Sequence, residues 1–230
     1  MNIRILHMIE GAREARGLTV VIDVFRAFSL ESYLFANGAQ KIIPVADLDF
    51  AYEYKSKHPN VLLAGERGGA MCEGFDFGNS PSQIIGTRMD GKTVVHTTSA
   101  GTQGLFGAKS AEIVLGACLA NASATAEYVK RIGADTVSIV CMGLAGKKET
   151  EEDTLCARYI KSLLEGDPIP LEAEIENLKY TSGAKFFDKE NTVFTEQDFH
   201  LCTKTDIFSF ALRLTEDENG LKYMRKIDVK

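Results

Sequence analysis

The sequence lacks the features that mark several large classes of protein. It contains no run near the roughly 18 apolar residues of a membrane span. Its first residues, MNIRILHMIEGAREARG, carry charges where a secretory signal would be apolar. The formal net charge is −6, which does not suit the basic face of nucleic-acid and membrane-surface proteins. We therefore expect neither a nucleic-acid nor a membrane partner.

Paired cysteines are also missing. The five cysteines are odd in number, scattered, and form no C-x-x-C pair, so neither a disulfide framework nor a zinc site is expected. No arginine stands six positions after a cysteine, which excludes the Cys-x5-Arg thiol phosphatases. A reduced, cytoplasmic location is the simplest interpretation.

Predicted strands and helices alternate along most of the chain. Short apolar runs predict strands at 2–8, 19–24, 41–45, 61–64, 92–98, 111–115 and 136–142. Helices are expected after the caps Ser29, Asp47 and Thr150 and over 120–132, with 11–17 as a charged connection. This pattern predicts an α/β fold, a mainly parallel or mixed sheet with helices on both faces. Residues 167–230, with a strand pair at 207–214 and 221–227, are expected to be a small α+β extension of one domain spanning 1–230.

The stretch TVVIDVFRAFS, residues 19–29, places charge at the end of an apolar strand. Asp23 interrupts the apolar run and Arg26 follows within reach of it. A buried charge is costly unless it is paired or holds a metal. Ligands of open α/β sheets bind beyond the carboxyl ends of strands, where these residues stand. A structural Asp–Arg pair and a functional site both remain open on this stretch alone.

Three further segments follow predicted strands and carry polar groups. The turn from His96 to Gly104, HTTSAGTQG, combines hydroxyls with glycines and suits an oxyanion, although the hydroxyls could also satisfy their own backbone. Glu66 and Arg67 open the glycine-rich loop at 65–81, which is either shaped around a small ligand or a solvated lid. Glu151, Glu152 and Asp153 either favour the positive end of a helix or place one carboxylate at a metal; the helix role is favoured for Glu151 and Glu152, and the role of Asp153 stays open.

Together these groups indicate a small, doubly charged anion as ligand. Carboxylates hold Mg²⁺, guanidinium groups bind oxyanions in pairs, and phosphoryl chemistry needs little beyond positioning and neutralisation of charge. Two other functions compete with this interpretation. Residues 86–93, GTRMDGKT, match the P-loop pattern, but a strand is predicted after Lys92 where a P-loop requires a helix. A non-enzymatic anion-binding protein is the second alternative.

Five segments, VVIDVFRAFS, LAGERGG, GFDFGNSP, HTTSAGTQG and GLAG…EEDTLCA, occur in an order that resembles the 2-phosphosulfolactate phosphatase (ComB) family. The resemblance implies a Mg²⁺-dependent hydrolysis of 2-phosphosulfolactate to 3-sulfolactate and phosphate, a step towards coenzyme M. It also implies a fold distinct from other phosphatases and a homo-oligomer, with a dimer favoured. The positions that match the family's site are Asp23, Arg26, Glu66, Arg67, Asp76, Asn79, Ser80, Thr97, Thr98, Ser99 and Asp153.

These positions, with those of the hydroxyl turn, give the expected roles. The catalytic group is Asp23, Arg26, Arg67 and Asp153. The metal ligands are Asp23, Glu66 and Asp76. The substrate-binding group is Asn79, Ser80, His96, Thr97, Thr98, Ser99, Gly101 and Thr102. The nucleophile, either a metal-activated water or an aspartate, stays open.

Overall fold

Ten strands form one mixed sheet in the order β1-β8-β2-β7-β9-β10-β3-β6-β4-β5. The computed structural model describes residues 1–229. The strands are β1 (Asn2–His7), β2 (Gly17–Ile22), β3 (Lys41–Val45), β4 (Leu62–Arg67), β5 (Ala70–Met71), β6 (Thr93–Thr97), β7 (Ala111–Ala117), β8 (Thr136–Cys141), β9 (Phe210–Glu216) and β10 (Lys222–Asp228). The α/β prediction with a mixed sheet is confirmed.

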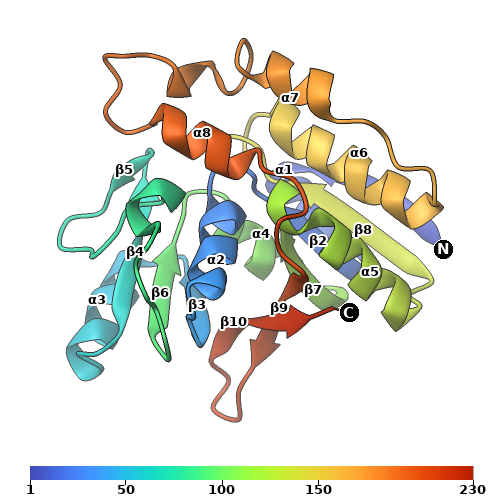
Figure 1. Cartoon of the computed structure of the whole chain (residues 1–230). Coiled ribbons are helices and arrows are strands. Elements are labelled where there is room, and N and C mark those ends of the chain that lie inside the picture. Colours follow the sequence, from blue (N-terminus) through green and yellow to red (C-terminus); the bar gives the residue numbers. More distant parts are fainter. Residues whose placement is uncertain (230) are drawn as a thin grey trace.

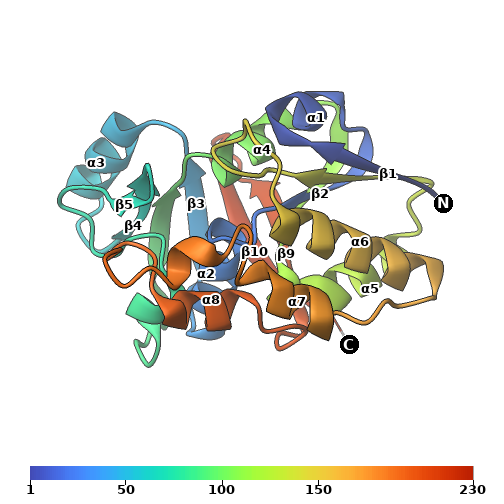
Figure 2. The ribbon, with the colours of Figure 1, turned by 90° about the horizontal axis from the view of Figure 1, so that it is seen from above.

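Helices flank this sheet on both faces (Figures 1 and 2). They are α1 (Met8–Glu14), α2 (Ala27–Ala36), α3 (Leu48–Lys57), α4 (Gly101–Gly107), α5 (Ala122–Ile132), α6 (Glu151–Glu165), α7 (Glu172–Leu178) and α8 (Glu196–Cys202), with short 3-10 turns η1 (Pro81–Ile84), η2 (Leu119–Asn121) and η3 (Ala184–Phe186). Over the strands β1, β8, β2 and β7, the pair α1 and α4 packs on one face and the pair α5 and α6 on the other (Figure 2). Within the described residues, none of these helices combines the length and apolar character of a membrane crossing.

The sheet consists of two parallel groups joined by a hairpin (Figure 1). The strands β1, β8, β2 and β7 are parallel, and so are β3, β6 and β4. The hairpin β9–β10 lies between the groups, with β9 antiparallel to β7 and β10 antiparallel to β3, so the two groups run in opposite directions. The expected strand pair near the C-terminus therefore exists, and its place is the middle of the sheet.

The joints on either side of the hairpin are short. Only Met224–Ile42 pairs β10 with β3, and only Leu115–Arg213 and Gly116–Leu212 pair β7 with β9. Neighbouring strands of a sheet are also rotated relative to one another, so the two parallel groups do not share one plane. The carboxyl ends of β2 and β6 consequently approach each other, and a Cβ added to Gly101 would lie 3.1 Å from Asp23 Oδ2.

Two local predictions are wrong. Residues 11–14, expected in the charged connection at 11–17, belong to α1, because Gly11 and Ala12 are buried and Gly11 lets the helix pack directly on Leu6. Ser29 lies inside α2 and does not cap it. The helix begins at Ala27, whose N–H donates to Asp23 Oδ1 at 3.0 Å, so the aspartate at the end of β2 serves the first turn.

Candidate functional site

A cavity of about 550 Å³ lies where the two parallel groups meet. The carboxyl ends of β2 and β4, the start of the segment after β6, the loop 143–150 and the first turn of α6 all contribute to its wall. A second part of the wall comes from the segment 181–194, which follows α7 and precedes α8 along the chain (Figure 2). The site thus combines segments that are far apart in the sequence.

One side of the cavity is acidic. Asp23, Glu66 and Glu152 line it, and their exposed fractions are only 7%, 7% and 3%. Burial is the main cause that raises the pKa of Asp23 from 3.8 to about 6; the charges of Glu66 and Glu152 contribute to this rise, and the N–H of Ala27 opposes it. Burial also raises the pKa of Glu152. Three buried carboxylates without a neutralising cation are costly, so this side is suited to a positive ion.

The carboxylate of Glu66 is held in a fixed orientation. Its Oε1 accepts the N–H of Ser99 at 2.6 Å, and its Oε2 accepts the N–H of Gly69 at 2.7 Å and the Ser99 hydroxyl at 3.1 Å. These donors come from the loop after β4 and from the segment after β6. Glu66 therefore ties two walls of the cavity together while its charge stays at the cavity surface.

Asp153 lies behind the cavity wall. It is 2% exposed, Oδ1 accepts the N–H of Val24 and Oδ2 accepts the N–H of Gly143, both at 2.8 Å. These two donors follow β2 and β8, so the first turn of α6 is fixed to both strand ends. Burial raises the pKa of Asp153 well above its usual value, and the charges of Glu152 and Asp23 add to that effect. The geometry gives Asp153 a positioning role for Asp23.

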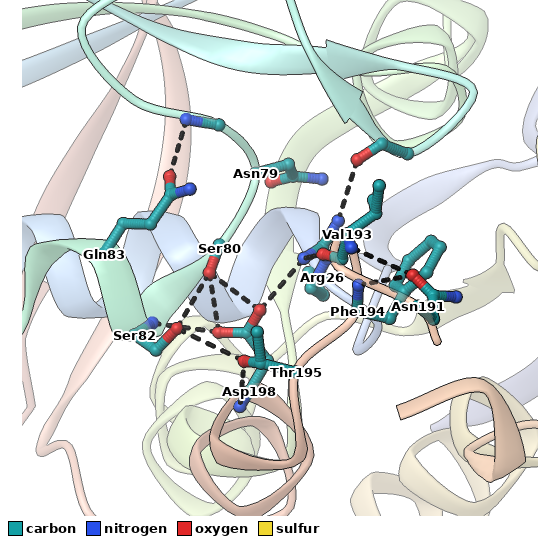
Figure 3. A network of polar contacts seen from close by, with 12 residues as sticks. Arg26, Asn79, Ser80, Ser82, Gln83, Asn191, Val193, Phe194, Thr195 and Asp198 are labelled. Atoms are coloured by element: carbon teal, nitrogen blue, oxygen red, sulfur yellow. Dashed lines mark hydrogen bonds and ion pairs between the residues drawn. The ribbon is translucent and has the colours of Figure 1, made fainter. Parts of the chain in front are cut away.

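Arg26 is enclosed by a network of partners (Figure 3). Its Nη1 lies 2.9 Å from Asp198 Oδ2 and donates to the carbonyl of Val193 at 2.9 Å, and its Nη2 donates to the carbonyl of Gly69 at 3.1 Å. The guanidinium also lies over the ring of Phe194, 4.5 Å from the ring centroid. Arg26 reaches the cavity surface, but its charge is paired with Asp198, which is fully buried.

Arg67 points away from the cavity. Its Nη2 donates to Thr97 Oγ1 and to the carbonyl of Ala46, both at 2.8 Å, and its Nη1 donates to the carbonyl of Glu66. It is not part of the cavity wall. Besides Arg26, the cations of the wall are Lys185, half-buried in η3, and the exposed Lys148.

The hydroxyl turn contributes less surface than the sequence predicts. Ser99 lines the cavity, whereas Thr97, Thr98, Gly101 and Thr102 lie behind it. Thr98 and Thr102 bond to each other, with the Thr102 N–H donating to Thr98 Oγ1 at 3.2 Å and the Thr102 hydroxyl to the Thr98 carbonyl at 3.1 Å. In this pair the hydroxyls bond to nearby backbone groups, which is the alternative to oxyanion binding that the sequence analysis left open.

A buried polar chain leads from the interior to the cavity. Glu31 Oε1 lies 2.8 Å from His96 Nδ1, and His96 Nε2 lies 3.3 Å from Asn79 Oδ1. His96 and Glu31 are 0% and 1% exposed, whereas Asn79 lines the cavity. His96 therefore cannot contact a ligand directly, and it orients the amide of Asn79 instead.

Comparison with known proteins identifies the family. A sequence model described as "2-phosphosulpholactate phosphatase" matches residues 4–217. The chain belongs to the 2-phosphosulfolactate phosphatase family. Proteins named "Probable 2-phosphosulfolactate phosphatase" from Bacillus subtilis and Thermoplasma volcanium are 35% and 32% identical, over 87% and 88% of this chain and 88% and 92% of theirs. One from Caldicellulosiruptor saccharolyticus is 45% identical over 63% of this chain and 61% of its own length.

Two further expected site residues, Ser80 and Asp76, do not line the cavity either. Ser80 donates to Asp198 Oδ1 and Oδ2 at 2.8 and 2.7 Å, so it belongs to the network around Arg26 (Figure 3). Asp76 is remote from Asp23 and Glu66: its carboxylate accepts the N–H of Leu63 at 2.8 Å and pairs with Lys55 at 3.5 Å. The expected three-carboxylate metal site with Asp76 is not formed, because the loop returns along β4 and leaves Asp76 near the other end of that strand.

The P-loop alternative finds no support in this family member. Residues 86–92 form a turn whose exposed Arg88 and Asp90 pair with each other, and β6 follows instead of a helix. The helix-terminal amides that a P-loop uses to bind phosphate are therefore missing at this turn.

Three residues in or beside the cavity wall escaped the sequence analysis. Glu152 was interpreted as a helix-end charge, although it is buried beside Asp23. Lys185 and Asp198 lie in the last quarter of the chain, in a segment without a strand or a recognisable motif. A weak signal existed for Asp198, because Thr195 caps α8 and an acidic residue at the third helical position follows that cap.

Proposed function

We propose that this chain is a Mg²⁺-dependent phosphatase that hydrolyses 2-phosphosulfolactate to 3-sulfolactate and phosphate. The observation that carries the proposal is the gathering of buried Asp23, Glu66 and Glu152 on one side of a cavity in a member of this family. The relatives' names support the substrate. The cavity volume, about 550 Å³, accommodates a small phosphorylated acid.

The donor set suits Mg²⁺. Within residues 1–229, no three His, Cys, Asp or Glu side chains form a closed metal cage. Mg²⁺ does not need one, because it is usually held by one or two carboxylates, several waters and the phosphate of the substrate. Asp23 and Glu66 would hold it here. When bound, the ion would neutralise charge on the phosphoryl oxygens and lower the pKa of a bound water.

The chain's own residues would position the phosphoryl group. Glu66 is oriented by Ser99 and Gly69, and Asp153 holds the backbone that follows Asp23. Hydrolysis breaks the bond between phosphorus and the ester oxygen, and that oxygen leaves as the protonated hydroxyl of sulfolactate. The attacking oxygen comes either from water or from the Asp23 carboxylate. Acid quenching of a single turnover with ³²P-labelled substrate distinguishes the two routes, because only attack by a carboxylate leaves labelled phosphate covalently bound to the protein.

A phosphate-release screen over small phosphorylated acids, with and without Mg²⁺, tests the proposal. Release from 2-phosphosulfolactate should require Mg²⁺ and should be abolished in Asp23→Asn, which leaves the shape of the side chain unchanged. The matched control is Asp188→Asn, an exposed carboxylate outside the cavity wall. Ligand-induced thermal stabilisation without phosphate release under any metal would instead favour a non-enzymatic anion-binding protein.

Three wider assignments belong to the same proposal. The product would enter coenzyme M synthesis, and the enzyme would act in the cytoplasm as a homo-oligomer, with a dimer favoured. The five cysteines are all unpaired and buried, which suits a reducing compartment. Light scattering on the purified protein measures the oligomeric state directly.

A further inference from the structure

Lys185 is a cation on the cavity wall with no paired carboxylate. Its Nζ lies over three aromatic rings, at 4.7 Å from the centroid of Phe194, 5.5 Å from Phe186 and 6.0 Å from Phe25. No ion pair within 4.0 Å joins it to any carboxylate of residues 1–229. Burial lowers the pKa of Lys185, so the fold holds a charge here against a desolvation cost. The rings attract the ammonium through cation–π contacts and fix its position.

The carboxylates near this lysine attract it without forming an ion pair with it in the described residues. Glu152, Asp23 and Asp153 attract the ammonium and Arg26 repels it. Asp23 is assigned to Mg²⁺ by the proposed function, and Asp153 is occupied by two backbone donors. Once a divalent cation lies on the acidic side, those carboxylates need no further positive partner, and the charge of Lys185 is available to an anion.

The substrate proposed above carries three anionic groups: phosphate, carboxylate and sulfonate. The two arginines are not available for the groups that Mg²⁺ leaves free, because Arg26 is paired with Asp198 and Arg67 lies outside the cavity wall. Next to Lys185 in the wall, Ser182 has a buried hydroxyl that completes no hydrogen bond in the described part of the chain. The acceptor beside it is the Glu152 carboxylate, whose pKa it lowers against the effect of burial. A buried donor without a partner is costly, and a bound ligand would satisfy it.

We propose that Lys185, assisted by the Ser182 hydroxyl, binds the sulfonate of the substrate. This inference rests on the proposed function and adds the residue that would select a sulfonated acid over an unsulfonated one. A hydrogen bond between an ammonium and an anion is short and strong, and its loss typically weakens binding by about 10- to 100-fold.

The test compares two substrates on wild-type protein and on Lys185→Gln. The substrates are 2-phosphosulfolactate and 2-phospholactate, which keeps the phosphate and carboxylate but has a methyl group in place of the sulfomethyl group. In the variant, KM for the sulfonated substrate should rise by about 10- to 100-fold, whereas kcat/KM for 2-phospholactate should change by less than about threefold. Lys185→Arg should restore part of the loss, and the exposed Lys189→Gln should match wild type.

Equal losses on both substrates would overturn the inference, because Lys185 would then serve the phosphoryl group or Glu152. An unchanged KM for the sulfonated substrate would overturn it as well. Calorimetric binding of 3-sulfolactate and lactate separates this inference from the proposed function. If wild type releases no phosphate but binds 3-sulfolactate, and Lys185→Gln weakens that binding by the same factor, then the sulfonate site stands and the phosphatase activity fails.

Discussion

Asp198→Ala is expected to destabilise the protein strongly, because it removes the counter-ion of Arg26. Asp198 is fully buried, and its two oxygens accept four close contacts: Nη1 of Arg26 at 2.9 Å, the Ser80 hydroxyl at 2.8 and 2.7 Å, and the N–H of Ser82 at 2.9 Å. The carboxylate thus joins α8 to η1 and to the end of β2 (Figure 3).

The magnitude follows from what remains after the substitution. Arg26 is 3% exposed, so its charge would stay buried with only the carbonyls of Val193 and Gly69 as partners. Removing one partner of a buried ion pair typically costs about 3–5 kcal/mol. A domain's whole free energy of unfolding is about 5–15 kcal/mol. We therefore expect Asp198→Ala to lower the free energy of unfolding by about 3–5 kcal/mol. The variant should stay folded, with only a small free energy of unfolding left.

Urea denaturation followed by far-UV circular dichroism measures this loss by linear extrapolation. Glu196→Ala is the matched control, since it removes an exposed carboxylate from the same helix and should change the free energy of unfolding by no more than about 0.5 kcal/mol. In the double variant with Arg26→Met, the combined loss should be smaller than the sum of the single losses, because no unpaired charge is left. A loss below about 1 kcal/mol in Asp198→Ala, or strict additivity, would refute this account of Arg26.

Two further predictions concern the acidic side and the strand that carries it. Because the pKa of Asp23 is raised from 3.8 to about 6, the metal-free protein should lose stability as the pH rises from about 4 to 7. Mg²⁺ binds the ionised carboxylate, so added Mg²⁺ should raise Tm more at pH 7.5 than at pH 5.5. Equal Tm shifts at both pH values would contradict this prediction. Gly65→Ala should lower the free energy of unfolding by roughly 2 kcal/mol or more, because φ of Gly65 is +150° and the added Cβ would meet the Thr97 carbonyl. The control is Gly86→Ala, whose added Cβ would point into open space and should lower the free energy of unfolding by about 1 kcal/mol in the same urea titration.

The parts of the site that follow strands could be predicted from the sequence. Asp23, Glu66 and Ser99 each stand at or just beyond the end of an apolar strand, and the chain direction alone sends such residues to the carboxyl end of a sheet. All three line the cavity. This kind of prediction needs only local periodicity, which is the strongest signal that a single sequence contains.

The orientation of the two arginines could not be predicted in the same way. Arg26 and Arg67 follow strands as well, yet both guanidinium groups are directed by acceptors that are distant in sequence or belong to the backbone, such as Asp198 and the Ala46 carbonyl. Which acceptor a long side chain reaches depends on how helices and strands pack against each other. The spacing of residues in the sequence does not indicate that packing. For the same reason Asp76, which is only ten residues from Glu66, lies away from it.

The place of the C-terminal region was equally hidden. The strands β9 and β10 are visible in the sequence as a hairpin, but nothing local indicates that they pair with β7 and β3 in the middle of the sheet. These pairings join residues 96 and 98 positions apart for β7 and β9, and 182 positions apart for β3 and β10. Burial of Ala211, Leu212 and Met224, all at 0% exposure, is what fixes the hairpin there.

The C-terminal region therefore completes a site that the first part of the chain begins. The acidic residues come from the strand ends and from α6, whereas Lys185, Phe194 and the Asp198 counter-ion of Arg26 come from the segment 181–198. A chain without this segment would keep three buried carboxylates and one buried arginine with neither the lysine nor the aspartate that balances them. Unbalanced buried charge is among the most costly features of a fold. The charges on the cavity wall are therefore stable only when the last quarter of the chain has folded onto them.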